Sequence, residues 1–142
     1  MNDKIKNENV KNGIIFPVGE PNTAYAKYFK GQSFLDHLVK DPDIDVTVSN
    51  VTFEPGARNN WHVHYGYQIL LVTGGEGWYQ EEGKPARHLV PGDVVVTKNN
   101  IKHWHGATKN SWFEHIAITN GKSKFLEPVS DAEYDQLGEN ND

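Results

Sequence analysis

Two histidine pairs carry the clearest chemistry in this chain. His62 and His64 are separated by one residue, and His103 and His105 repeat that spacing further along the chain. Side chains two positions apart on a β-strand point to the same face, so each pair aims both imidazoles in one direction. Neutral imidazole is the commonest metal-binding side chain. Two such strands facing one pocket therefore predict a divalent-metal site inside a β-structure.

Short strand-like runs separated by turn signals make up the centre of the chain. Pro91-Gly92-Asp93 and Lys98-Asn99-Asn100 are two of these turn signals. Runs of this length and spacing are typical of an all-β sandwich or barrel. The predicted strands cover residues 46–53, 61–65, 68–73, 77–81, 87–90, 94–97, 103–105 and 112–119.

Two short helices and two flexible termini are predicted around these strands. Ser33 can cap a small helix that runs to about Val39, and Ser130 with Glu133 forms a capping box for a second helix that ends near Leu137. The chain has 142 residues, which fits one domain. We expect that domain over residues 13–137, with a flexible polar arm at 1–12 and a flexible tail at 138–142.

Strand alternation sorts the side chains onto two faces. Gln68 shares one face of its strand with Leu70 and Val72. Phe113, His115, Ala117 and Thr119 share a face of the last strand. Both faces of these strands are often apolar, as in Ile69-Leu70-Leu71-Val72 and Val94-Val95-Val96. This pattern predicts a barrel wall that is covered on its outside as well.

Composition excludes several classes of function. The net charge is −5 and no basic cluster stands out, so nucleic acid is not an expected partner. No apolar run approaches the roughly 20 residues that a membrane-spanning helix needs. The polar N-terminus lacks the apolar segment of a signal peptide, which predicts a cytoplasmic protein. The chain contains no cysteine, and this excludes thiolate ligands and a cysteine nucleophile.

The histidines sit inside a longer spacing pattern that resembles the two motifs of the cupin superfamily. The resemblance covers about residues 50–120 and implies an all-β cupin barrel, a double-stranded β-helix of the jelly-roll type, with short peripheral helices. Five residues separate the first two members of the pattern, then one, three and six, and ten residues separate the last two. The members, in order, are Gly56, His62, His64, Gln68, Gly75, Gly92 and His103.

The chain departs from the cupin motifs at a few positions. Gln68 stands where a Glu is usual, and Ala107 replaces the final Asn of the second motif. Lys98 and Asn100 replace the Pro and Gly of the second-motif turn. Asn tolerates left-handed backbone dihedrals almost as Gly does, so we expect that turn to be kept.

The details narrow the resemblance to small single-domain cupins. The chain is similar to a subgroup that includes manganese-dependent hydroxynitrile lyases and carboxymuconolactone decarboxylase-like cupins. That similarity implies that His105 and His115 line the pocket as catalytic residues. The metal ligands that it implies are His62, His64, Gln68 and His103.

The residue type at Gln68 bears on the chemistry of such a site. A neutral amide leaves a divalent ion its full +2 charge, whereas a Glu would reduce the charge of the site to +1. A more electropositive ion polarises a bound oxygen or nitrile more strongly, which favours Lewis-acid chemistry. Imidazole suits Zn, Cu, Fe and Ni, and carbonyl oxygen suits Mn. Because the chain resembles manganese-dependent cupins, manganese is the expected ion. Iron, zinc and nickel remain alternatives.

Each candidate residue also has a structural interpretation. Any of the histidines of the pattern can be a packed barrel residue, and Gln68 can bond the backbone near the ligands. His105 and His115 can act as a catalytic base or as packed polar side chains. We expect His37 and His88 on the surface. Three further residues are predicted to lie in a loop. Arg58 is either a solvated charge or a contact for an anionic substrate, and Asn59 and Asn60 form turns.

The function that these residues predict is a small metal-dependent enzyme. The metal would activate a small substrate as a Lewis acid while His105 or His115 moves a proton, as in a hydroxynitrile lyase. A metal-dependent oxygenase and a non-catalytic module that binds a metal and a small molecule are the alternatives. We expect a small-molecule substrate and a homodimer or a higher even homo-oligomer. The apolar segment Ile14-Ile15-Phe16 can cross to a partner subunit.

Overall fold

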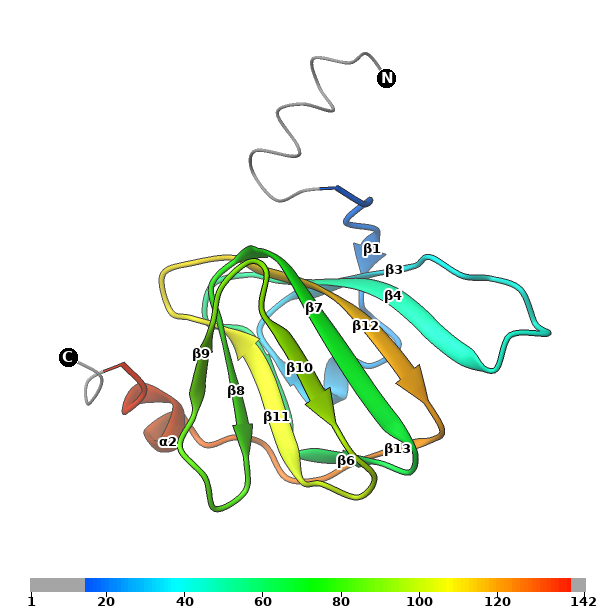
Figure 1. Cartoon of the computed structure of the whole chain (residues 1–142). Helices are drawn as coiled ribbons and strands as arrows, with labels where there is room; N and C mark the ends of the chain where they lie inside the picture. The colour runs from blue at the N-terminus through cyan, green and yellow to red at the C-terminus, as the bar shows by residue number, and fades with distance from the viewer. Residues whose placement is uncertain (1–14, 139–142) are drawn as a thin grey trace, which may run out of the picture.

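The computed structural model describes residues 15–138, and its strands form two antiparallel sheets that face each other (Figure 1). The first sheet has the order β1-β3-β4-β12-β7-β10. In the second sheet the order β13-β6-β11-β5-β2 is extended by β8, which pairs with β11, and by β9, which pairs with β8. The prediction of an all-β cupin barrel of the jelly-roll type is confirmed.

The strands of the first sheet supply one wall of the barrel. They are β1 (Glu20–Pro21), β3 (Ser33–His37), β4 (Val46–Phe53), β7 (Tyr67–Gly75), β10 (Val94–Thr97) and β12 (Phe113–Asn120). The strands of the second sheet supply the facing wall. They are β2 (Phe29–Lys30), β5 (Arg58–Asn59), β6 (His62–His64), β8 (Gly77–Glu81), β9 (Arg87–Leu89), β11 (His103–Ala107) and β13 (Ser123–Phe125).

Two helical elements lie outside the sheets. The short 3-10 helix η1 (Ala26–Tyr28) precedes β2, and α2 (Asp131–Asp135) follows β13. The predicted capping box at α2 is confirmed, because the Ser130 side chain accepts from the Glu133 backbone while the Glu133 side chain accepts from the Ser130 backbone. None of the helices in the described part of the chain has the length and apolar character needed to cross a membrane.

The helix predicted from Ser33 to about Val39 is wrong. Ser33–His37 form strand β3, which pairs with β4 on one side and with β1 on the other. Ser33 is buried, and its hydroxyl accepts from Asn22 Nδ2 at 3.3 Å instead of capping a helix. The open edge of β4 offers a full ladder of backbone hydrogen bonds, and this tertiary partner overrides the local cap signal.

The loop predicted at Arg58, Asn59 and Asn60 is also partly wrong. Arg58 and Asn59 form strand β5, and Arg58 is only 4% exposed. Its guanidinium lies 2.6 Å from Asp131 and stacks over the Tyr134 ring at 4.1 Å. Arg58 is therefore neither a solvated charge nor a contact for a substrate in the barrel. It fastens α2 to the second sheet.

Two backbone features position the strands that carry the histidines. Asn100 adopts a positive φ of 63°, so the left-handed turn expected before His103 is present. In the other feature, the register between β12 and β7 shifts between Glu114 and His115. A bulge of this kind bends the strand and re-aims the side chains beside it.

The predicted alternation along the barrel strands is confirmed. Gln68, Leu70 and Val72 are buried on one face of β7, while Ile69 and Leu71 are only partly buried on the other. The main apolar cluster packs between the two sheets and includes Phe53, Leu70, Leu89, Val95 and Phe113. A smaller cluster of Trp61, Trp78, Trp104, Val129 and Tyr134 packs where α2 covers the second sheet.

The two predicted termini fall largely outside the described residues. The arm at 1–12 lies outside them entirely, as do residues 139–142 of the tail. Ile14 of the proposed crossing segment lies outside them too, while Ile15 and Phe16 are 57% and 39% exposed. The expectation that this segment crosses to a partner stays a prediction.

Candidate metal centre

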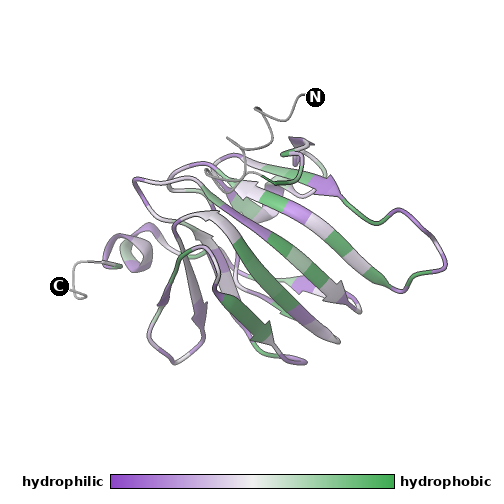
Figure 2. Cartoon of the chain, turned by 45° about the horizontal axis from the view of Figure 1, so that its top comes forward, coloured by the Kyte–Doolittle hydropathy of each residue, from purple (hydrophilic) through white to green (hydrophobic). Residues whose placement is uncertain are grey.

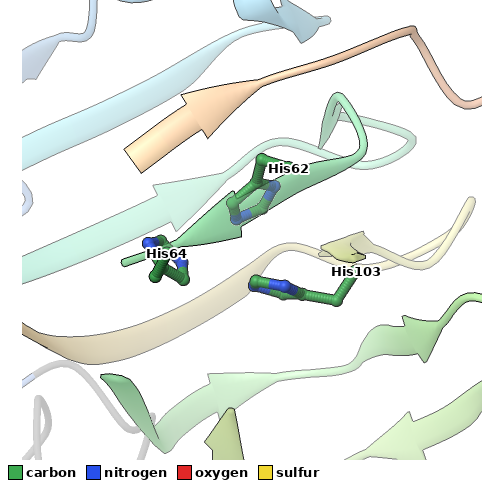
Figure 3. Close-up of side chains that lie close together, drawn as sticks. All are labelled: His62, His64 and His103. Atoms are coloured by element: carbon green, nitrogen blue, oxygen red, sulfur yellow. The ribbon is translucent and has the colours of Figure 1, made fainter. Parts of the chain in front are cut away.

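Three of the predicted ligands meet between two neighbouring strands of the second sheet. His62 and His64 lie on β6, and His103 lies on β11 directly opposite His62 in the strand register. One ring nitrogen from each of the three lies within 4.8 Å of the others, and all three side chains are buried. Figure 3 shows the three rings gathered between these strands. The spacing of one residue on β6 brings its two imidazoles to the same side, as strand alternation requires.

Backbone carbonyls orient two of these rings. Nδ1 of His62 lies 2.8 Å from the Asn60 carbonyl oxygen, and Nδ1 of His103 lies 2.8 Å from the Ile101 carbonyl oxygen. A carbonyl can only accept, so Nδ1 carries the proton in both rings and Nε2 keeps its lone pair. His103 Nε2 is buried without a hydrogen-bond partner in the described chain. A buried lone pair of this kind costs free energy unless a cation or donor meets it.

Gln68 stands beside the three histidines on the facing sheet. Its Oε1 lies 3.0 Å from His64 Nε2, and its Nε2 donates to the Thr119 hydroxyl at 3.0 Å. Nδ1 of His64 is bonded to the Ser123 hydroxyl at 2.7 Å. Two ligands at right angles, each about 2.1 Å from an ion, stand about 3.0 Å apart. The separation of these two atoms therefore fits neighbouring ligands of one cation.

The electrostatics of the site favour neutral imidazoles. Burial lowers the pKa of His62 well below its ordinary value, and the neighbouring His103 and His64 lower it further. Burial also lowers the pKa of His64, and it lowers that of His103 to about 4. A metal ligand must be unprotonated, so these histidines need no deprotonation at neutral pH before an ion binds. The donor set of three imidazoles and an amide oxygen fits a divalent transition ion.

His105 and His115 form a second pair beside this cluster. Their ring centroids are 5.0 Å apart in an edge-on arrangement, and the His105 ring lies 5.6 Å from that of His62. Both side chains are buried, and both ring nitrogens of His115 are without a partner in the described chain. Burial lowers the pKa of His115 to about 3 and lowers that of His105 well below its ordinary value. Both rings are therefore neutral bases near pH 7.

Asn59 supports His105, a role that the sequence did not suggest. Its Oδ1 accepts from the backbone N–H of His105 at 3.0 Å, and its Nδ2 lies 3.2 Å from Nε2 of the same residue. The spacing of a turn-forming Asn gives no signal for this contact, because it depends on the pairing of β5 with β11. Ser123 and Thr119, which hold His64 and Gln68, were missed for the same reason.

Gln68 and four of the five clustered histidines, His62, His64, His105 and His115, line a cavity of about 700 Å³ between the sheets. One wall is aromatic: Tyr28 and Phe125 stack with centroids 4.3 Å apart, and Phe125 lies 5.2 Å from the His62 ring. The described lining contains no Asp or Glu, although the whole chain carries a net charge of −5. This volume is in the range of small-molecule sites.

The two remaining described histidines lie apart from the cluster. His88 is exposed and pairs with Glu76 at 3.2 Å, as expected of a surface residue. His37 is exposed as predicted, but its ring also lines the cavity from β3 and is bonded to the Ser49 hydroxyl at 3.0 Å.

The fold and the metal-binding pattern define this protein as a cupin. Residues 49–119 match the cupin domain family, and the chain belongs to that family. The (R)-mandelonitrile lyase of Granulicella tundricola is 42% identical over 114 residues, which are 77% of this chain and 87% of that protein. A cupin-like protein from Thermotoga maritima superposes with a TM-score of 0.83 at 42% identity, over 89% of this chain and 98% of that one.

More distant structures share the fold alone. A DMSP lyase from Ruegeria pomeroyi superposes with a TM-score of 0.59 at 19% identity, over 78% of this chain and 57% of that one. At this distance the barrel is shared while the chemistry is decided by the side chains in the cavity.

Proposed function

We propose that this cupin is a metal-dependent lyase that cleaves and forms hydroxynitriles in its central cavity. His62, His64, Gln68 and His103 would hold one divalent ion, with manganese as the first candidate and iron, zinc or nickel as alternatives. The observation that carries the proposal is the placement of two further neutral histidines, His105 and His115, on the same cavity. The 42% identity to the mandelonitrile lyase supports the choice of substrate class.

The protein's own residues supply the proton transfer. When bound, the ion supplies Lewis-acid stabilisation of negative charge on oxygen or cyanide. A neutral ring nitrogen of His105 or His115 takes the hydroxyl proton of the substrate. The carbon–cyanide bond then breaks, its electron pair leaves with cyanide, and a carbonyl group forms. The protonated ring returns its proton to cyanide, which leaves as hydrogen cyanide.

The cavity provides the conditions that this proton transfer needs. Burial keeps the pKa of both rings low, so each is unprotonated and ready to accept near neutral pH. Asn59 fixes the position of His105, and the stacked rings of Tyr28 and Phe125 give a flat apolar wall beside the cluster. An aromatic hydroxynitrile fits such a wall through ring stacking.

The test is turnover of mandelonitrile by the metal-loaded protein, followed as the release of benzaldehyde and hydrogen cyanide. We expect His105→Ala or His115→Ala to lower kcat by at least about 100-fold while metal content stays at one equivalent. His88→Ala, a change on the surface, should leave both quantities as they are. Full activity in both cavity variants contradicts the proposed roles. Substrate-dependent oxygen consumption without cyanide release would replace the lyase with the oxygenase alternative.

A further inference from the structure

The cavity extends well beyond the metal cluster, across the inner face of the first sheet. Gln68, a predicted ligand, lines it from β7, and His37 lines it from β3, with β4 and β12 between the two strands. His37 lies opposite Ser49 on β4, and Ser49 lies opposite Ala117 on β12. Three strand spacings of about 4.8 Å place β3 roughly 14 Å from β7 along the sheet. His37 is therefore too far away to bind the same ion as Gln68.

The lining of β3 and β4 becomes polar toward this remote end of the cavity. Leu35 and Val51 line the part that adjoins the main apolar cluster. Two residues further along each strand, the lining side chains are His37 and Ser49. Bands of different hydropathy alternate along β4 and β12 in Figure 2. Neither the metal cluster nor the proposed proton transfer uses this polar end, so its polarity needs another reason.

His37 and Ser49 form a pair of hydrogen-bonding groups that is already in place. The Ser49 hydroxyl lies 3.0 Å from His37 Nδ1, and the Ser49 residue is only 3% exposed. The His37 ring is exposed, and its Nε2 has no hydrogen-bond partner in the described chain. An imidazole nitrogen and a serine hydroxyl can each exchange a hydrogen bond with a ligand. The pair can therefore bind a polar group at the remote end of the cavity.

The aromatic wall also continues past the metal cluster. Phe125 lies 5.2 Å from the His62 ring, and Tyr28 stacks on Phe125 at 4.3 Å. Tyr25 extends the wall, with its centroid 6.3 Å from that of Phe125, and Tyr25 is 46% exposed. The wall thus runs from the buried cluster to the rim of the cavity. A surface of this length and chemistry favours a flat, apolar ligand that is longer than one ring.

We propose that His37 and Ser49 form a distal subsite, which binds a terminal hydroxyl group on an elongated aromatic substrate. This inference rests on the proposed lyase function, and it specifies the substrate as an aromatic hydroxynitrile with a hydroxyl-bearing chain on its ring. The reacting carbon lies at the metal cluster, and the aromatic body lies along Tyr28 and Phe125. The cavity of about 700 Å³ has room for such a ligand, whereas a hydroxynitrile with one bare ring leaves the distal end empty.

The chemistry of the subsite selects a hydroxyl group over a charged one. The described lining holds no Asp or Glu, so a substrate ammonium group has no carboxylate to pair with. A hydroxyl can donate to one member of the His37 and Ser49 pair and accept from the other. Lys122 and Lys124 also lie at the rim, which makes a carboxylate the competing end group.

The experiment compares the binding of two stable alcohols to the metal-loaded protein by calorimetry. The compound 4-(2-hydroxyethoxy)benzyl alcohol ends in a hydroxyl, and 4-propoxybenzyl alcohol has the same length but ends in a methyl group. We expect the native protein to bind the first about tenfold more tightly, because two ordinary hydrogen bonds give a difference of that size.

Two substitutions test the assigned residues. His37→Phe keeps a ring at this position but removes its nitrogens, so the preference for the hydroxyl-ended alcohol should disappear. Ser49→Ala removes the second group and should reduce the preference. His88→Phe makes the same change as His37→Phe at an exposed histidine outside the cavity, and it should keep the full preference. An undiminished preference in both His37→Phe and Ser49→Ala would overturn the subsite.

Turnover distinguishes the subsite from the lyase function on which it rests. The hydroxynitriles of the two corresponding aldehydes should show the same preference in kcat/KM. Cleavage of mandelonitrile by a protein that binds both alcohols equally would overturn the subsite and leave the lyase function standing. A preference of the native protein that is lost in His37→Phe, without cleavage of any hydroxynitrile, would support the subsite and contradict the lyase function. Tighter binding of 4-(carboxymethoxy)benzyl alcohol than of the hydroxyl-ended alcohol would overturn the choice of a hydroxyl.

Discussion

The inner face of the six-stranded sheet carries polar side chains around the cavity beside its apolar core residues, whereas the outer face of its central strands is largely apolar. Toward the barrel interior, β7 and β12 present Gln68, His115 and Thr119, all around the cavity. Toward the outside, the same strands present Ile69, Leu71 and Ile118. Polar side chains inside and apolar side chains outside are the informative exceptions to burial rules.

The side chains on the two faces also differ in their effect on the stability of the folded chain. On the inner face, buried imidazoles with unpaired lone pairs reduce stability until an ion or substrate meets them. On the outer face, apolar side chains in water add stability only once they are covered. The stability of the inner face should therefore depend on whether a ligand is bound.

The largest expected effect is the loss of metal from an inner-face variant. His62→Ala or His64→Ala should lower metal affinity by more than about 100-fold, because a ligand is removed outright. The barrel should stay folded, since the main apolar cluster does not include either residue. Elemental analysis with circular dichroism checks both statements. His88→Ala is the matched control and should keep its metal. One full equivalent in both ligand variants would make the assignment wrong.

Substitutions of two adjacent leucines on β7 allow a direct comparison of the two faces. Leu70 is fully buried inside, and Leu71 is partly exposed outside. Leu70→Ala should lower the free energy of unfolding by about 2–5 kcal/mol at every protein concentration. Leu71→Ala should cost less, because its side chain is already partly exposed to solvent in the folded chain. Denaturant unfolding of both variants measures this. Equal losses would remove the distinction between the faces.

Acid should destabilise the metal-free protein through the inner face. Unfolded histidines take up a proton near pH 6.5, whereas folded His103 does so only near pH 4 and His115 near pH 3. The unfolded chain therefore binds more protons below pH 6.5, and stability falls as pH falls. Each of these two residues accounts for about 2 kcal/mol between pH 6.5 and 5. Chemical unfolding across this range is the measurement. A flat profile would show that the rings are not buried as described.

The smallest expected effect concerns the charge of the site. Gln68→Glu keeps the shape and adds a carboxylate, so the ion should bind at least as tightly. Turnover of mandelonitrile should fall about tenfold at equal metal occupancy, which corresponds to about 1.4 kcal/mol. The added negative charge weakens the polarisation of the substrate. Gln136→Glu makes the same charge change on an exposed residue and serves as the control. Unchanged or higher activity in Gln68→Glu would argue for a redox or purely binding role.

Local patterns were enough to predict much of the fold. Alternation placed Gln68, Leu70 and Val72 on one face, and the predicted strands 46–53, 77–81 and 94–97 have the observed bounds. The apolar residues on both faces also predicted a covered outer wall, but Val94 and Val96 on that face are 52% and 55% exposed in the described chain. The histidine spacing was sufficient because a strand fixes the direction of side chains two positions apart. The prediction for Asn100 succeeded because a single residue type decides that turn.

The predictions that failed concern residues whose contacts depend on partners distant in the chain. The sequence around Ser33 predicts a helix cap, and only the pairing with the free edge of β4 makes Ser33 part of a strand. The sequence around Arg58 predicts a charged loop residue. Its burial depends on α2, which places Asp131 and Tyr134 against it. Asn59 acquires its contact with His105 through the pairing of β5 and β11. Short strands of two or three residues leave too little pattern to predict.

The most direct test of the inner face is a crystal structure of the purified protein with anomalous scattering recorded at the absorption edges of manganese, iron, nickel and zinc. We expect one strong anomalous peak between β6 and β11. It should be bonded to Nε2 of His62, His64 and His103, with Gln68 Oε1 as the fourth protein ligand. A peak elsewhere, or a cluster that stays empty when the protein is saturated with each of these ions, would contradict the proposed metal centre.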